Sequence, residues 1–460
     1  MVLRMRSLHL PPNLPHSLLR IAALTIFAVS ASAAIAQDPF PQLHQDLSNS
    51  RIRIAAADFK PSGSDSGTVA QKHTFDTVLY SDLQNAGIFD LVSKTMQPTA
   101  TPGYPTEINL AQWSTPPVSA SMVAFGNFAV QSGRLVVNGF LDDAKNTQFP
   151  QVFAKQYNEP AGEESARQIA HRFADEIILR LGGGVNGIAE SKLYYIKLGG
   201  PNDKEIWEMD YDGANQHPIT HLGTISMSPR VSPDNSRLAF SALDLRAGFT
   251  VKMYSLLLGR MVTFNGGSNS GAPAWTSDGN QLAFSSSRSG HPEIWVADTE
   301  GRIAHQVTNF GSDTSPTWNP KTNGQIAFIS GRSHLPQLYI MESDGSGVTR
   351  MTDGGYASSP SWSPNGQFIA FAWDRKYGPG APGGQDIYVM EVASKRWIQL
   401  THDEGRCDFP TWSPDGRHIA YASSAGGRAA NSRIMTMLVD GTQKHALTGA
   451  GADMPNWSWK

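Results

Sequence analysis

The chain has 460 residues but only one cysteine, Cys407, so it can form no internal disulfide. A cysteine-rich zinc site and a CxxC redox centre are excluded for the same reason. Charged residues make up only 17% of the chain, and 37 basic residues face 40 acidic ones. A net charge of −3 argues against binding of nucleic acid or of an anionic membrane by bulk electrostatics. We therefore expect no nucleic-acid partner.

Catalytic motifs are missing as well. The sequence contains no GxSxG elbow, no GxxxxGK[ST] phosphate loop, no HExxH and no EF-hand loop. We interpret Cys407 as an unreactive loop residue. These absences favour binding over catalysis. We expect no enzyme, no catalytic residue, no metal and no cofactor.

The amino terminus has the pattern of an export signal. Three arginines within the first twenty residues precede an apolar stretch at 21–33, and Ala34-Ile35-Ala36 is a small-x-small cleavage pattern. No later apolar run reaches eighteen residues, so we expect no direct membrane insertion. We predict a signal peptide over residues 1–36, cleaved near Ala36, and a mature protein of the periplasm. The mature chain would carry 34 basic and 40 acidic residues.

One sequence motif occurs six times after residue 223: Pro-x-Trp, a turn like Ser-Pro-Asp-Gly, and then Ile/Leu-Ala-Phe. Its prolines are Pro229, Pro273, Pro316, Pro360, Pro410 and Pro455. The successive spacings are 44, 43, 44, 50 and 45 residues. A period near 44 made of short β runs and glycine turns is typical of propeller blades of four antiparallel strands.

Each repeat predicts the four strands A to D of one blade. Strand A contains Pro-x-Trp, an Asp-Gly or Asn-Gly pair makes a two-residue hairpin with positive φ, and strand B contains Ile-Ala-Phe. Segments such as 293–296 and 306–308 predict strands C and D. We expect the tryptophans to pack between neighbouring blades; the first repeat has Val231 in that place.

The two ends of the repeat region complement each other. Residues 193–220 predict strands B, C and D without a strand A, and residues 455–457 predict a strand A with nothing after it. Pairing them closes the ring and leaves no open sheet edge. The fold class is therefore mainly β, with a six-bladed β-propeller over residues 185–460.

Residues 37–184 show no repeat and predict a small α/β domain. We expect strands at 51–59, 121–130, 134–141 and 152–157, and helices near 69–86 and 166–181. Gly182-Gly183-Gly184 ends the second helix and serves as the linker. Apolar residues at helical spacing, which we interpret as core, are Val69, Phe75, Val78, Leu79, Leu83 and Ala86, then Ala166, Ile169, Ala170, Phe173, Ile177, Ile178 and Leu181.

Strand direction separates two faces of the propeller. Antiparallel strands alternate in direction, so the A–B and C–D hairpins lie on one face, and the B–C loops and D–A crossovers lie on the other. The second face has the variable segments, including an insertion at 376–384 that lengthens one repeat. Variable loops on a rigid scaffold are where binding usually occurs. We expect a partner site there that includes Tyr356 and Asp408.

Together these parts resemble the TolB family of Gram-negative bacteria, including the segment Ser81-Asp82-Leu83-Gln84-Asn85-Ala86-Gly87-Ile88-Phe89. The resemblance implies a non-enzymatic, monomeric component of the Tol-Pal envelope system, active during envelope constriction and cell division. It implies that the peptidoglycan-associated lipoprotein Pal binds across the propeller mouth, where Asn269, Ala272 and Thr314 fall on lining positions. It also implies a TolA contact through the mature amino terminus, although residues 37–49 do not match the family's usual start.

An exported propeller enzyme is the alternative, because some metal-dependent polysaccharide lyases hold a metal on histidines at the same mouth. In this chain, His291 and His334 fall in B–C loops farther from the axis. A serine-peptidase propeller is excluded because the chain has no room for a hydrolase domain.

Overall fold

The computed structural model describes residues 51–460 except 201, 303, 378–383, 403 and 428. The predicted signal peptide at 1–36 and the segment 37–49 lie outside the described residues. So does most of the insertion predicted at 376–384.

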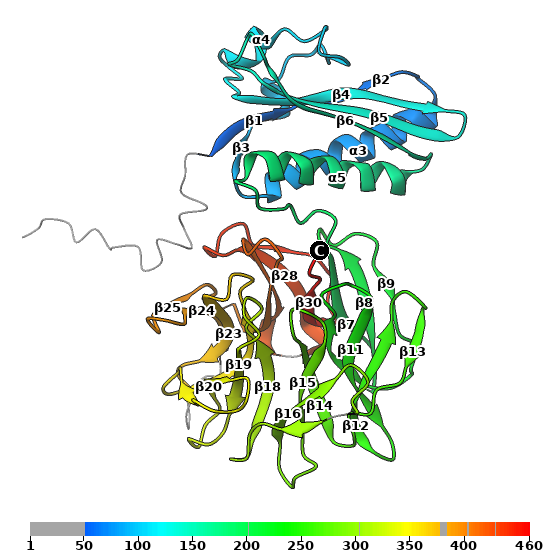
Figure 1. Cartoon of the computed structure of the whole chain (residues 1–460). Helices are drawn as coiled ribbons and strands as arrows, with labels where there is room; N and C mark the ends of the chain where they lie inside the picture. The colour runs from blue at the N-terminus through cyan, green and yellow to red at the C-terminus, as the bar shows by residue number, and fades with distance from the viewer. Residues whose placement is uncertain (1–50, 201, 303, 378–383, 403, 428) are drawn as a thin grey trace, which may run out of the picture. The chain divides into compact units, whose positions relative to one another are not determined.

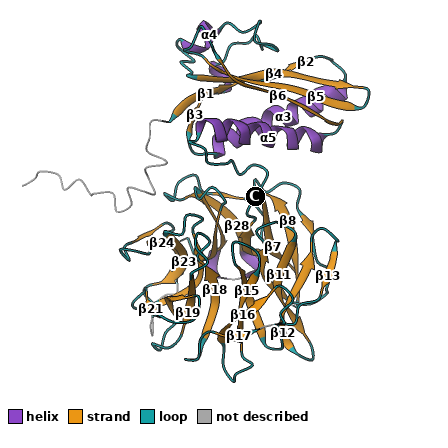
Figure 2. Ribbon diagram, in the orientation of Figure 1, coloured by secondary structure: helices purple, strands orange, loops and turns teal. Residues whose placement is uncertain are grey.

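The described amino-terminal part is an α/β module, as predicted (Figure 2). Its sheet has the order β3-β1-β4-β5-β6, with β2 paired to β4; β1 runs parallel to β3 and β4, and β4, β5 and β6 are antiparallel. The sequence interpretation missed η1, α4 and β2, which are five residues long or shorter. The elements are β1 (Ile52–Ala56), β2 (Lys60–Pro61), α3 (Ser66–Asn85), β3 (Phe89–Leu91), η1 (Lys94–Met96), α4 (Leu110–Ser114), β4 (Met122–Gln131), β5 (Arg134–Asp143), β6 (Gln151–Pro160) and α5 (Glu163–Leu181).

Alternating side chains give this sheet two buried faces. Ile54 of β1 packs with Phe75 of α3 and Phe173 of α5, whereas its neighbour Ala55 packs with Trp113 of α4. The helices α3 and α5 therefore cover one face, and α4 lies on the other (Figure 2). The predicted helical stripe is core except at Val69, whose exposed fraction of 51% contradicts that assignment.

The rest of the described chain forms six four-stranded sheets arranged as a β-propeller (Figure 1), which confirms the predicted fold. The last strand, β30 (Ala452–Trp457), pairs with β7 (Lys192–Gly200), so one blade is shared between the two ends of the propeller. That blade is completed by β8 (Asp203–Asp210) and β9 (His217–Pro218). The other blades, in order, are β10 (Ser226–Val231), β11 (Arg237–Asp244), β12 (Gly248–Ser255) and β13 (Arg260–Val262); β14 (Ser270–Trp275), β15 (Gln281–Ser286), β16 (Glu293–Asp298) and β17 (His305–Gln306); β18 (Asp313–Trp318), β19 (Gln325–Ser330), β20 (Gln337–Glu342) and β21 (Thr349–Arg350); β22 (Tyr356–Trp362), β23 (Phe368–Asp374), β24 (Asp386–Glu391) and β25 (Trp397–Gln399); and β26 (Arg406–Trp412), β27 (His418–Ser424), β28 (Ser432–Leu438) and β29 (His445–Ala446).

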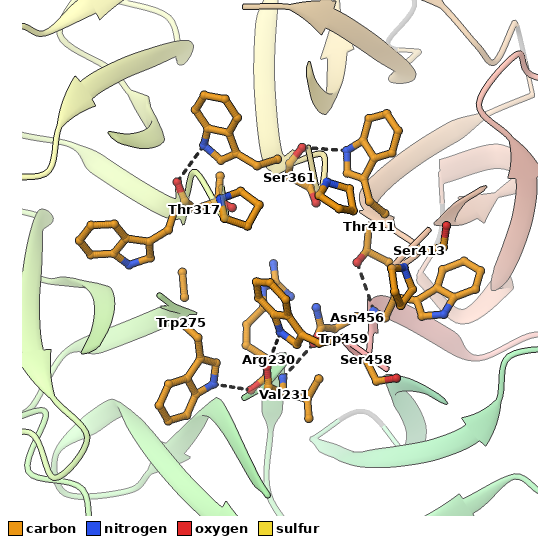
Figure 3. Close-up of a pocket in the computed structure, with 18 of the residues that line it drawn as sticks. Arg230, Val231, Trp275, Thr317, Ser361, Thr411, Ser413, Asn456, Ser458 and Trp459 are labelled. Carbon is orange, nitrogen blue, oxygen red and sulfur yellow. Dashed lines mark hydrogen bonds between the residues drawn. The ribbon is translucent and has the colours of Figure 1, made fainter. Parts of the chain in front are cut away.

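The repeated tryptophans join neighbouring blades, as predicted. All five are buried, and four of them lie in a core cluster with residues of the preceding blade; Trp362, for example, packs against Ala327 and Leu338. Three indole N–H groups also donate to the preceding strand A (Figure 3). These bonds run from Trp275 to the Arg230 carbonyl at 3.0 Å, from Trp362 to Thr317 at 3.1 Å and from Trp412 to Ser361 at 3.0 Å. In the first copy, Val231 packs with Tyr194 and Ile196 of the shared blade.

The turns between strands A and B are longer than predicted. The Thr276 amide donates to the Gln281 carbonyl at 3.1 Å, so the loop contains four residues and the expectation of a two-residue hairpin was wrong. Asp278 closes the loop by accepting from the Thr276 hydroxyl and the Asn280 amide. Only the loop's third residue, Gly279, needs a positive φ, here 70°.

Candidate partner-binding face

We call the side of the propeller with the B–C loops and D–A crossovers the mouth face, and the side with the A–B and C–D turns the hairpin face. Asn269 directly precedes β14 on the mouth face. The other four predicted site residues lie inside strands A, not in loops. The loop assignment was therefore wrong: strand A begins three or four residues before its Pro-x-Trp segment.

A bulge explains the early start of these strands. The pairing of β14 with β15 shifts register between Gly271 and Ala274, and the same shift occurs in every strand A. Ala272 lies within this bulge with φ 48° and donates its amide to the Ser241 hydroxyl at 3.0 Å. A bulge turns nearby side chains in a new direction. The residues with positive φ at this position are Ser228, Ala272, Ser315, Ser359, Phe409 and Met454.

Two of the predicted residues differ in accessibility. Thr314 is half-buried in β18, where it pairs with Ile329. Asp408 is only 4% exposed and forms an ion pair with Arg406 at 2.6 Å. It also accepts from the Ser358 hydroxyl at 3.2 Å. The Asp408 carboxylate therefore holds neighbouring side chains in place more than it offers itself to a partner.

Tyr356 borders a hollow of about 500 Å³ on the mouth face. Its ring lies 5.6 Å from the ring of Tyr377, between centroids, and the exposed fractions of the two are 36% and 51%. Asp374, Gln385 and Arg406 provide the polar part of the described lining. An apolar hollow with a few fixed polar groups is suited to a partner's side chain.

Arginines near the ends of strands B reinforce this face. The guanidinium groups of Arg288, Arg332 and Arg375 lie 4.4 Å from the ring of Trp295, 5.0 Å from Tyr339 and 4.3 Å from Trp397. Stacking on an aromatic ring holds an arginine in one orientation. The sequence interpretation missed them. They follow the Phe of Ile/Leu-Ala-Phe by four residues in three consecutive blades, and that spacing could have found them.

Arg332 is also fixed by a buried carboxylate. Its Nη2 lies 2.8 Å from Asp313, which is fully buried at the start of β18. Burial raises the pKa of the Asp313 carboxyl, and the neighbouring Ser330 hydroxyl and Arg332 guanidinium oppose that shift. The arginine is thus held from two sides, by an acid and by an aromatic ring.

Large apolar side chains are exposed on the same face. Leu245, in the B–C loop between β11 and β12, is 94% exposed, and Phe310, in a D–A crossover, is 75% exposed. The Arg332 guanidinium lies 5.5 Å from the Phe310 ring. Exposed aromatics beside arginines are the composition that protein interfaces favour.

A repeated polar contact joins the end of strand D to the start of strand C, next to the mouth-face loops. The hydroxyl of the threonine after strand D donates a hydrogen bond to the side chain of the first residue of strand C. It also accepts a hydrogen bond from the backbone N–H of the second residue of strand C. Thr401, for example, donates to Asp386 at 2.8 Å and accepts from the Ile387 amide at 2.9 Å. Thr308 and Thr352 make the same pair of bonds in their blades. Such satisfied buried networks keep the base of the mouth face rigid.

The described residues contain no group of three or more His, Cys, Asp or Glu side chains placed to hold a metal ion. His291 has its Nδ1 2.8 Å from Glu293. Cys407 lies within β26, not in a loop, and burial raises its pKa to about 11. Over the described part of the chain, no helix is long and apolar enough to cross a membrane.

A six-bladed propeller closed by its own last strand, with an α/β module before it, defines the class of this protein. Family comparison assigns it further. The TolB beta propeller domain matches residues 180–459, and the TolB amino-terminal domain matches residues 45–148. The chain belongs to the TolB family.

Individual relatives agree with this assignment. The Tol-Pal system protein TolB of Gluconobacter oxydans (strain 621H) is 31% identical over 236 residues, which are 50% of this chain and 49% of that protein. The protein TolB homolog of Chlorobium chlorochromatii (strain CaD3) is 27% identical over 44% of each chain. The chain thus spans about half the length of these curated relatives. The crystal structure of TolB from Acinetobacter baumannii has the same fold, with a TM-score of 0.71 and 22% identity over 89% of this chain and 97% of that one.

Proposed function

We propose that this protein is a non-catalytic, periplasmic component of a Tol-Pal system that docks a Pal-like lipoprotein on its mouth face. The docked protein links the inner and outer membrane complexes during envelope constriction and cell division. Asn269, Ala272, Thr314 and Tyr356 contribute to the docking surface, and Asp408 positions Arg406 beside it.

One observation carries this proposal: the mouth face combines exposed aromatics with arginines held on aromatic rings. Phe310, Tyr356 and Tyr377 offer rigid apolar area, and Arg332 and Arg375 offer oriented charge. Little side-chain entropy is lost when such pre-ordered groups bind. The family assignment and the relatives' names add the system in which such a partner occurs.

The test is the affinity of the mature chain, residues 37–460, for the soluble domain of the Pal homologue encoded by the same genome, measured by calorimetry. Phe310→Ser and Tyr377→Ser should each weaken binding at least about tenfold, since central aromatic anchors carry most interface energy. Leu257→Ser is the matched control, because Leu257 is 80% exposed on the hairpin face. The proposal would be refuted if the wild type and the three variants bound the Pal homologue with equal affinity, or if the wild type did not bind it. Metal-dependent cleavage of a uronate polymer would support the lyase alternative instead.

The proposed TolA contact can be separated from Pal docking. It involves residues 37–49, which are far in sequence from the propeller loops. A mature chain that begins at residue 50 should lose binding to the soluble domain of TolA and keep its affinity for Pal. Unchanged TolA binding would assign that contact to another surface, and loss of both partners would show that the segment does not act separately.

A further inference from the structure

The residue between Pro and Trp in each repeat faces the axis of the propeller. Together with neighbouring prolines and tryptophans, these six side chains line a cavity of about 150 Å³ (Figure 3). They are Arg230, Ala274, Thr317, Ser361, Thr411 and Asn456. Only one of the six is charged. The ring therefore concentrates a single positive charge at the axis.

Arg230 has no counter-ion in this cavity. Its Nη1 donates to the adjacent Pro229 carbonyl at 2.8 Å, and no aspartate or glutamate occurs among the described residues that line the space. Burial lowers its pKa to about 10, so the guanidinium remains protonated at neutral pH. A guanidinium has five N–H donors, and Arg230, which is half-buried, carries its charge in this cavity without a partner. The side chain thus has unused donors and an uncompensated charge.

The neighbouring polar groups also present donors. The Asn456 Oδ1 accepts from the Val231 amide at 2.9 Å, which leaves its Nδ2 as a donor. The Thr411 hydroxyl accepts from the Trp457 amide at 3.2 Å, so its proton is available to another acceptor. The backbone carbonyls of Arg230, Thr317 and Ser361 already accept from indole N–H groups. The cavity wall therefore offers hydrogen-bond donors and positive charge.

We infer that this axial cavity is a binding site for a small oxyanion, of carboxylate or phosphate chemistry, held by Arg230 and Asn456. The planar guanidinium fork matches two oxygens of either group. A cavity of about 150 Å³ can hold a ligand of roughly benzene's size. The ligand supplies the charge that the wall lacks, so it stabilises the closed ring. This site is separate from the mouth-face hollow and does not depend on the proposed partner.

Sodium phosphate and sodium acetate are the probes, added to the mature wild-type protein against sodium chloride at equal ionic strength. At least one should raise the melting temperature by a few degrees and give one-site calorimetric binding with a dissociation constant of about 1 mM or below. The probe that binds more tightly distinguishes phosphate from carboxylate as the source. If both behave like chloride at concentrations well above that constant, the inference is wrong.

Three variants connect the effect to the cavity. Asn456→Asp keeps the acceptor for the Val231 amide and places an internal carboxylate in the same cavity as Arg230, so the anion response should disappear. Arg230→Met should also lose the response and be no less stable in chloride. Arg246→Met is the control, because Arg246 is exposed in a B–C loop. A response that survives Asn456→Asp, or that Arg246→Met removes, would place anion binding elsewhere.

Discussion

The two faces of the propeller use the same scaffold in different ways. On the hairpin face, the four-residue turn that contains Gly279 recurs with the same hydrogen bonds around Ser363 and Ser413. On the mouth face, most loop residues differ from blade to blade, and exposed Phe310 lies near a buried ion pair. The repeated strands and inter-blade tryptophans hold the ring together, and variation on the mouth face creates a surface for recognition. Changes to the repeats should therefore alter stability, and changes to the mouth face should alter binding.

Removal of the last six residues should have the largest effect. The truncation takes away Trp457, which is 3% exposed, and the pairing of Asn456 with Tyr194 in the shared blade. Without this strand the ring is open and two sheet edges lose their partners. We expect the cooperative thermal transition to disappear in circular dichroism and the protein to aggregate in size-exclusion chromatography. Removal of Lys460 alone is the control, and a truncated chain that still melts cooperatively near the wild-type temperature would contradict this view of closure.

Loss of one inter-blade tryptophan should be the next largest change. Trp362→Ala removes a buried ring and its hydrogen bond to the Thr317 carbonyl. A cost of about 3–5 kcal/mol in the free energy of unfolding follows from such truncations. Trp362→Phe, which keeps most of the apolar area, should cost less. Urea unfolding measures both, and a loss below about 1 kcal/mol for the alanine variant would show that the blades do not depend on this contact.

A third change, made outside both faces, separates stability from binding. Asp142 in β5 is fully buried with neither carboxylate oxygen hydrogen-bonded, and burial raises its pKa from 3.8 to about 6. The folded state therefore binds this proton more tightly than the unfolded state. Asp142 favours folding at low pH, and this contribution declines as the pH rises from about 4 to 6.

Asp142→Asn should remove that pH dependence. We expect the variant to be more stable than the wild type above pH 6 by about 2 kcal/mol, with the difference shrinking toward pH 4. Urea unfolding across this range is the measurement, and partner affinity should not change. If the wild type is the more stable protein at neutral pH, the carboxylate must have a role in the fold that its burial does not reveal.

The smallest effect is expected at a single turn of the hairpin face. Gly279→Ala places a Cβ at φ 70°, and the nearest atom to that Cβ would be 3.5 Å away. The cost should come from backbone conformation alone, about 1 kcal/mol. Gly449→Ala, at a glycine without positive φ, is the matched control. Equal melting temperatures for the two variants would show that the turn tolerates a side chain.

The sequence predicted the blades well because one motif is repeated. A wrong strand assignment in one repeat can be recognised by comparison with the equivalent residues of the other repeats. Strand lengths were less predictable. The residue with positive φ in the bulge is serine in three copies and Ala272, Phe409 or Met454 in the others. No single residue type marks this position, so the early start of strand A escaped detection. Val69 fits the helical period yet is exposed in the first turn of α3, where its neighbour Thr68 is the buried residue.

The candidate site was predicted only in part, because its important features are spatial. The alternation of strand direction was predictable from the repeats, but the contacts of Asp408 with Arg406 and with Ser358 of the neighbouring blade were not. The position of the Arg230 charge at the axis was likewise not predictable from one repeat, because the cavity forms only when ring closure brings six equivalent positions together.

Hydrogen–deuterium exchange of the complex tests the central claim most directly. We predict that binding of the Pal homologue's soluble domain will slow exchange in the mouth-face segments around Asn269, Phe310 and Tyr356. Exchange in the hairpin-face turns around Gly279, Gly366 and Gly416 should stay at the rate of the free protein. Protection of those turns, with the mouth-face segments unchanged, would contradict the assignment of recognition to the mouth face.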